Sequence, residues 1–336
     1  MEQNFSYSDV VISSRIRLAR NFKNIPFPAK LLDDRAFEIQ KKVFSAVQNL
    51  DDFSFYQISS LDENTKGVLM EKHLISANLA KNKFSAIILS KNERVSIMLN
   101  EEDHIREQSF IKGFNLKLAY SKLSKLDDAI IENCNIAYSD ELGFLTACPT
   151  NLGTGLRASC MLFLPALSLN NKMEEVLSLV KKRKQTIRGF YGEGSEALGY
   201  IYQISNQTTL GKSEFEIIED VEKTIYEICA LEIQERMLFS KEYEKQLENK
   251  AQKFLKELLS GESISIQDFM EKVAIIKLYL FFKPNLKSQN ELLDELVAIV
   301  QPCSLKEICG KEIKSNDVDL FRGQYLKKIL KNVIQI

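Results

Sequence analysis

Several residue types are scarce in this chain of 336 residues, and each shortage excludes a class of function. Tryptophan is absent, and the only two histidines, His73 and His104, lie far apart in the sequence, which excludes a histidine-rich metal site. The six cysteines are scattered without a C-x-x-C pair, so neither a zinc spacing nor a disulfide framework is indicated. We therefore predict reduced thiols and no metal held by protein side chains.

The chain also lacks a surplus of charge and a long apolar run. Its net charge is -1, so no general basic excess is available for binding nucleic-acid phosphates. Residues 1–5 are mostly polar, unlike a signal peptide. The most apolar stretch, 275–282, contains Lys277 and is too short to span a bilayer. These absences predict a cytoplasmic protein that binds neither nucleic acid nor membrane.

The composition, with 45% hydrophobic and 27% charged residues, is that of a globular protein. The length suggests two domains. The first two thirds of the chain combines short β-like runs with loops. Residues 84–89 and 95–99 are apolar and β-branched and flank a polar turn, which predicts a hairpin. Residues 160–164 and 200–204 are further strand candidates.

The pattern changes at Ser213, which forms a capping-box signature with Glu216. Apolar residues then recur at helical spacing, and helical sequence continues to Gly261 and resumes near Ser265 and Asn316. Strands followed by a helical tail predict an α+β fold, with an antiparallel sheet in a catalytic domain and an appended helical domain.

Two glycine motifs suggest nucleotide binding but have the wrong context. Residues 153–158 fit the loose pattern G-x-G-x-x-A, yet a strand rather than a helix is predicted to follow. Residues 211–213 resemble the end of a P-loop, but Asn206 stands where that loop needs glycine. We interpret Gly211 as a turn before a helix.

Four polar segments are better candidates for chemistry. In the first, Ser13–Asn21, an extended conformation points Arg15 and Arg17 the same way, so that two guanidinium groups can hold one anion. The second, Asn100–Arg106, contains three consecutive acids. Taken alone, each of these two segments also fits a solvated surface.

The third segment, Cys148–Ser159, starts with a cysteine at a glycine-containing turn and carries Arg157 at the start of a predicted strand. Alone, Cys148 is as well explained as a packed thiol. The fourth, Arg188–Glu196, is a glycine-rich loop of the kind that closes over substrates, or else a surface turn. The basic run Lys181–Lys184 precedes it and is either a solvated face or a contact for acidic partners or nucleotide.

Together and in this order, the four segments resemble the phosphagen (guanidino) kinase family, and specifically its protein-arginine kinase branch. The resemblance extends from about Val10 to Gly211. It implies an antiparallel sheet flanked by helices, ATP with Mg²⁺ as cofactors, and two carboxylates, Glu102 and Glu193, that hold and deprotonate a guanidinium group beside the thiolate of Cys148. The nucleotide-contacting residues that it implies are Ser13, Ser14, Arg15, Ile16, Arg17, His73, Arg106, Arg157, Ala158, Ser159, Cys160, Met161, Arg188, Gly189, Phe190, Tyr191 and Gly192.

The implied chemistry is consistent with these residue types. Phosphoryl transfer spreads negative charge over the equatorial oxygens, so arginines and Mg²⁺ stabilise it without a P-loop lysine. An acceptor arginine has a pKa above about 12, so carboxylates must orient it and remove a proton as the new bond forms.

The resemblance also implies a protein substrate. Metabolite kinases of the family carry a small helical domain before the first arginine segment, and only 12 residues precede Ser13 here. We expect a catalytic domain over residues 1–240 and a helical dimerisation and substrate-docking domain over 241–336. The family further implies a homodimer and, as partners, a zinc-binding activator protein, a stress-response repressor and an AAA+ unfoldase.

One segment departs from the pattern of this branch. An R-D-x-x-R-A motif that is thought to bind phosphoarginine corresponds here to residues 318–323, in which valine replaces the first arginine while Asp319 and Arg322 remain. Two other functions stay open at this point: a kinase of free arginine or another guanidino metabolite, and a non-catalytic adaptor for a repressor or an unfoldase.

Overall fold

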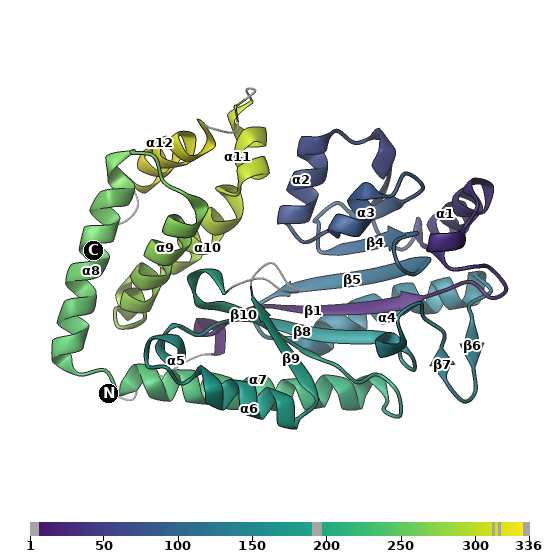
Figure 1. Ribbon diagram of the computed structural model, residues 1–336, viewed down its shortest axis with the longest axis horizontal. Helices are drawn as coiled ribbons and strands as arrows, with labels where there is room; N and C mark the ends of the chain where they lie inside the picture. Colours follow the sequence, from purple (N-terminus) through teal and green to yellow (C-terminus); the bar gives the residue numbers. More distant parts are fainter. Residues whose placement is uncertain (1–6, 190–196, 311–312, 315–316, 332–336) are drawn as a thin grey trace.

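An eight-stranded antiparallel sheet forms the centre of the protein in this computed structural model, which describes residues 7–189, 197–310, 313–314 and 317–331 (Figure 1). The strand order is β2-β3-β4-β5-β1-β8-β10-β9, so the N-terminal strand β1 lies in the interior of the sheet. The strands are β1 Val11–Arg20, β2 Phe53–Gln57, β3 Ala86–Ser90, β4 Val95–Leu99, β5 Ile105–Lys112, β8 Leu156–Phe163, β9 Gln185–Gly189 and β10 Ile201–Asn206, with a small separate hairpin of β6 Tyr138–Ser139 and β7 Gly143–Phe144.

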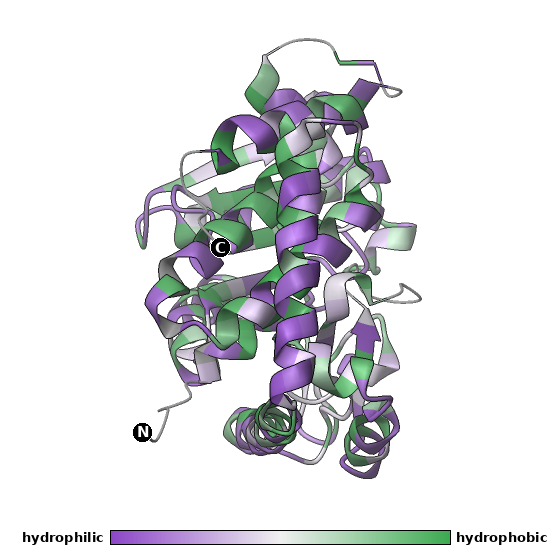
Figure 2. Ribbon diagram, turned by 90° about the vertical axis from the view of Figure 1, so that its left-hand side faces the viewer, coloured by the Kyte–Doolittle hydropathy of each residue, from purple (hydrophilic) through white to green (hydrophobic). Residues whose placement is uncertain are grey.

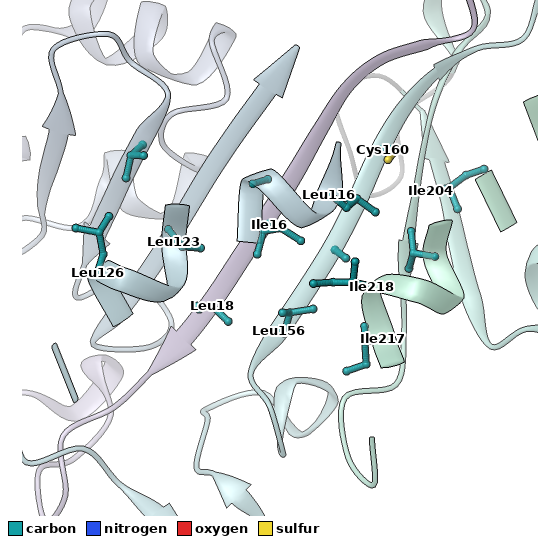
Figure 3. Close-up of a cluster of buried hydrophobic side chains, with 14 of the residues drawn as sticks. Ile16, Leu18, Leu116, Leu123, Leu126, Leu156, Cys160, Ile204, Ile217 and Ile218 are labelled. Atoms are coloured by element: carbon teal, nitrogen blue, oxygen red, sulfur yellow. The ribbon is translucent and has the colours of Figure 1, made fainter. Parts of the chain in front are cut away.

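Helices cover one whole face of this sheet. They are α1 Asp33–Val47, α4 Leu116–Asn133, α6 Met173–Lys182 and α7 Glu214–Met237. Their apolar sides meet alternate residues of the strands, and Ile16 and Leu18 of β1 belong to the same buried cluster as Leu116, Leu123 and Leu126 of α4 (Figure 3). Burial of this apolar layer is the main force that fixes the sheet, because it removes whole side chains from water.

The opposite face is covered only at its two ends. Helices α2 Glu63–Glu71 and α3 Ala77–Lys81 pack over β3 and β4 with a small core of their own. A C-terminal group of helices packs around Phe163 and Ile201 at the other end. Its members are α8 Lys241–Ser260, α9 Ile266–Phe281, α10 Lys287–Ile299, α11 Pro302–Cys309 and α12 Val318–Leu330, and the short α5 Pro165–Leu169 lies beside them. The middle of this face stays open.

The C-terminal helices also contact the other end through α2. The carboxylate of Glu71 accepts hydrogen bonds from the main-chain N–H groups of Cys303 and Ser304 at 2.7 and 2.8 Å, at the start of α11. Gly67 allows this approach, since a Cβ there would lie 2.3 Å from the sulfur of Cys303. The open face is therefore bounded on both sides by helices that touch one another.

Most of the elements expected from the sequence are present. The hairpin of β3 and β4, the strands β8 and β10, and the helices α7 to α9 and α12 are confirmed, and Ser213 and Glu216 form the complete capping box. The expected sheet flanked by helices is confirmed, but the flanking helices α1, α4 and α6 were not located in the first two thirds of the chain, where only strand runs and loops were assigned. The division expected at residue 240 falls between α7 and α8. The outward side of α8 is almost continuously hydrophilic (Figure 2). No helix in the described ranges is both long and apolar enough to cross a membrane.

Candidate active site

The open face of the sheet carries a group of arginines. In β1 the side chains alternate, so that Ile16 and Leu18 enter the core while Arg15 and Arg17 lie on the open face, as predicted. Arg17 stands opposite Arg157 of β8 in the strand register. Arg106 of β5 and Arg188 of β9 line the same cleft. The antiparallel sheet thus brings together guanidinium groups from four strands.

These arginines are close enough to repel one another. The pKa of Arg15 is lowered, first by burial and then by the charges of Arg106 and Arg157. The pKa of Arg17 is lowered for the same reasons, and its Nε atom is buried without a hydrogen-bond partner among the described residues. Guanidinium groups that are buried together and repel one another favour the binding of an anion between them.

Polar residues of the neighbouring strands orient these guanidinium groups. Arg15 donates to Oε1 of Gln203 at 2.8 Å, and Arg157 donates from Nε and Nη2 to Oγ of Ser205 at 3.2 and 3.0 Å. Arg106 donates to Oε2 of Glu101 at 2.5 Å. Gln203 and Ser205 were not predicted as site residues, although their position on either side of the buried Ile204 was a signal of a polar face on this strand.

A cleft of about 430 Å³ lies at the end of the face nearest the C-terminal helices, and Ser13, Arg15 and His73 line it. The lining also includes Ser159, Met161 and Ala298, the last from α10. His73 adopts a left-handed backbone conformation, with φ of 57°. Burial and the charges of Arg15 and Arg17 lower its pKa to about 4, so it is neutral at pH 7. The neutral His73 ring and the apolar side chains of Leu74, Phe110 and Met161 offer surfaces that suit a flat heterocycle.

A second cleft, of about 530 Å³, continues over the same face. It is lined by Arg17, Arg106, Arg157 and Arg188, together with the carboxylate residue Glu102 and the thiol residue Cys148. Glu102 is exposed to solvent. The Sγ atom of Cys148 lies 3.0 Å from Oγ1 of Thr150. The predicted acid, thiol and arginines, which come from distant parts of the sequence, therefore share one cleft.

Asp103 connects the segment of Glu102 to the loop of Cys148. Its Oδ1 accepts hydrogen bonds from the main-chain N–H of Ala147 at 2.7 Å and from Nδ2 of Asn21 at 2.6 Å. Burial raises the pKa of Asp103, and these two hydrogen bonds oppose the rise. Asp103 directly follows Glu102 and Ala147 directly precedes Cys148, so the hydrogen bond between them holds the segments of these two candidate residues together.

The comparisons with known proteins agree with this geometry. Residues 38–235 match the model of the ATP:guanido phosphotransferase C-terminal catalytic domain. The chain belongs to the ATP:guanido phosphotransferase family. It is therefore an enzyme that transfers a phosphoryl group to guanidino nitrogen.

The relatives of this phosphotransferase extend over nearly its full length. It is 38% identical over 329 residues to a protein-arginine kinase of Clostridium acetobutylicum, covering 96% of this chain and 97% of that one. Identity with a protein-arginine kinase of Clostridium kluyveri is 40% over 341 residues, covering 98% and 96%. The solved structure of a lombricine kinase is similar with a TM-score of 0.61 at 27% identity, covering 68% of this chain and 67% of the other.

Four residues of the predicted nucleotide-binding set face away from the clefts of this phosphotransferase. Ser14, Ile16, Ala158 and Cys160 alternate with the site residues on β1 and β8, so their side chains lie on the helix-covered face (Figure 3). Burial raises the pKa of Cys160, and Oγ of Ser14 donates to the carbonyl of Gly113 at 2.8 Å. Only the main chain of these four residues is available to the open face.

Part of the predicted site lies outside the described residues. Phe190, Tyr191, Gly192 and Glu193 fall there, and Gly189 is the last residue of β9. The described ranges hold no group of three or more histidine, cysteine, aspartate or glutamate side chains that could bind a metal ion.

The glycine pattern of residues 153–158 has a structural explanation in this fold. Gly153 has φ of 102°, and a Cβ there would lie 2.4 Å from the carbonyl oxygen of Thr209. Gly155 has φ of 65°, and a Cβ there would lie 2.6 Å from the carbonyl oxygen of Ala19. Both positions require glycine because the loop turns tightly before β8, which is a strand and not a helix.

The altered C-terminal motif is built into the helical core. Arg322 is 1% exposed and donates to the carbonyl oxygens of Val300 and Ile264 at 2.9 and 2.7 Å. It also pairs with Asp319, and a Cβ on Gly323 would meet the carbonyl oxygen of Glu262 at 1.7 Å. The guanidinium group of Arg322 thus stabilises the helix packing.

Proposed function

We propose that this phosphotransferase moves the γ-phosphoryl group of MgATP to arginine side chains of other proteins. The observation that carries the proposal is the arginine-lined cleft with Glu102 and Cys148 at its wall. The named relatives, which are protein-arginine kinases matched over 96–98% of this chain, support a protein acceptor over a metabolite.

The two clefts suggest how ATP lies on the sheet. The adenine and ribose occupy the cleft of His73 and Ser13, and the phosphates extend toward Arg17, Arg106 and Arg157. Each guanidinium group offers several donors to phosphate oxygens, and Mg²⁺ neutralises part of the charge that develops in the transition state. Because Gln203 and Ser205 already orient two of these arginines, little reorganisation is needed when the nucleotide binds.

The acceptor end requires negative groups, because the incoming arginine is a cation whose lone pairs are delocalised. Glu102 provides one carboxylate at the cleft, and the family resemblance assigns the second to Glu193. The carboxylates orient the guanidinium in line with the γ-phosphate and take its proton as the N–P bond forms and the bond to ADP breaks. The exposure of Glu102 fits an acceptor that arrives on a polypeptide.

The first experiment measures label transfer from ATP with Mg²⁺ to an arginine-rich protein and to free arginine, side by side. We expect label on protein arginine, mapped at neutral pH because the N–P bond is acid-labile. Glu102→Ala should abolish transfer, while nucleotide binding persists because the arginines remain. Label on free arginine alone would assign the protein to the metabolite kinases, and full activity of Glu102→Ala would refute the assigned base.

Further proposals concern the protein's context. We infer a cytoplasmic homodimer that acts in stress response and protein quality control, with a zinc-binding activator, a repressor and an AAA+ unfoldase as partners. The family resemblance supports these assignments. Co-purification of such partners, and the mass of the protein in solution, would test them.

A further inference from the structure

A basic groove of about 540 Å³ lies beside the catalytic cleft. Its charged lining consists of Lys182, Arg183, Lys184, Lys212 and Lys223, opposed by a single acid, Asp220. The whole chain has a net charge of -1, so this concentration of positive charge is local. We define these residues as the basic groove.

Three separate segments contribute to the basic groove. They are the run Lys182–Lys184 between the end of α6 and β9, Lys212 in the loop before α7, and Lys223 of α7. A lysine in the last turn of a helix is explained by the helix dipole, but this accounts only for Lys182. The convergence of cations from several elements therefore needs another explanation.

The groove keeps an excess of unpaired positive charge. Arg183 is bound to Glu227 at 2.5 Å and Lys212 to Asp220 at 2.5 Å. Within the described residues, Lys182, Lys184 and Lys223 form no ion pair and are exposed. These three ammonium groups are available to an anionic partner.

The basic groove adjoins the catalytic cleft at the edge of the sheet. Asn206 lines both, and its neighbours divide between them, with Gln207 in the cleft and Thr208 in the groove. Strand β9 lies between the two, since Gln185 lines the groove on the side of α7 and Thr186 lines the cleft on the open face. In the described sheet β9 is the last strand, so it has a strand neighbour only on the β10 side. An extended polypeptide can run along such an edge.

We propose that the basic groove binds acidic residues that flank the target arginine in the substrate protein. This inference rests on the proposed function, because only a polypeptide acceptor can reach both the cleft and the groove. The arginine enters the cleft toward Glu102, and the flanking chain passes around the β9 edge of the sheet into the groove. There its carboxylates meet Lys182, Lys184 and Lys223, which raises the rate of productive encounter.

The test uses two synthetic peptides that each contain one arginine. In one peptide glutamates stand on both sides of the arginine, and in the other glutamines replace them. We expect kcat/KM for the acidic peptide to be higher by roughly tenfold, and the preference to shrink at high salt, since exposed charges are screened. Equal rates, or a preference for the glutamine peptide, would overturn the proposal.

Variants of the protein test whether the basic groove causes this preference for the acidic peptide. The triple variant Lys182→Gln, Lys184→Gln, Lys223→Gln should lose the preference for the acidic peptide while phosphorylating the glutamine peptide at the wild-type rate. A matched control, Lys41→Gln, Lys122→Gln, Lys125→Gln, removes three exposed lysines from α1 and α4 and should retain it. Retention of the preference in the groove variant would overturn the assignment. If neither peptide is labelled and free arginine is, the proposed function itself fails, and the role of the groove with it.

Discussion

His73 faces two arginines, and these surroundings determine its protonation state. Its folded pKa of about 4 lies below the ordinary value of about 6.5, because burial and the charges of Arg15 and Arg17 oppose a further cation. The unfolded chain therefore binds a proton at higher pH than the folded chain does. The contribution of His73 to stability is complete above pH 6.5 and is lost as pH falls toward 4.

We expect the free energy of unfolding to fall by about 1–2 kcal/mol more in the wild type than in His73→Asn between pH 7.5 and pH 5. Asparagine does not titrate and tolerates the positive φ at this position. Urea unfolding at the two pH values measures the difference. An identical pH dependence in the two proteins would mean that His73 is protonated as easily in the folded state as in the unfolded one.

At the scale of elements, the loop before β8 and the turn after β4 are joined through Asp103. Asp103→Ala would remove the acceptor of the Ala147 and Asn21 hydrogen bonds and let the Cys148 loop move relative to Glu102. We expect kcat to fall by about 10- to 100-fold with little change in KM for ATP, because the arginines stay in place.

Asp103→Asn is the matched control, since it keeps the accepting oxygen but not the charge. Recovery of most of the activity in Asp103→Asn would identify Asp103 as a positioning residue. If Asp103→Asn is as impaired as Asp103→Ala, the negative charge itself acts on the acceptor.

How far the sequence could predict these elements depends on the range of the interactions. Alternation in β1 is local, so the common direction of Arg15 and Arg17 could be predicted. The contact of Arg15 with Gln203 depends on the register between strands far apart in the chain, which no local pattern encodes. The helices α1 and α4 were not predicted, because runs of β-branched residues were the pattern used to assign that part of the chain. Helix α4 nevertheless has an Asn115 cap and buries leucines at helical spacing.

At the scale of the whole molecule, the contact between α2 and α11 joins the C-terminal helices to the nucleotide side of the site. Glu71, which binds the start of α11, lies two residues before His73. We expect Glu71→Ala to lower the free energy of unfolding by about 1–2 kcal/mol, because two N–H groups of α11 lose their acceptor.

Glu63→Ala on the same helix is the control, since this side chain is 91% exposed and its pairing with Lys66 contributes little. Urea unfolding of both variants measures the difference. Equal losses in the two variants would show that the contact between α2 and α11 adds no stability of its own.

The central position of β1 has a consequence for how the protein tolerates insertions and deletions. This strand pairs with β5 on one side and β8 on the other, and its even and odd residues serve the core and the site respectively. A single residue inserted between Arg15 and Arg17 would exchange the two sets, placing a guanidinium among the helices and an aliphatic side chain in the cleft. One inserted residue would thus remove stability and activity together. The pairing of β1 with β8 already contains a register shift between Val11 and Ser13, so an insertion is better tolerated at that end of the strand.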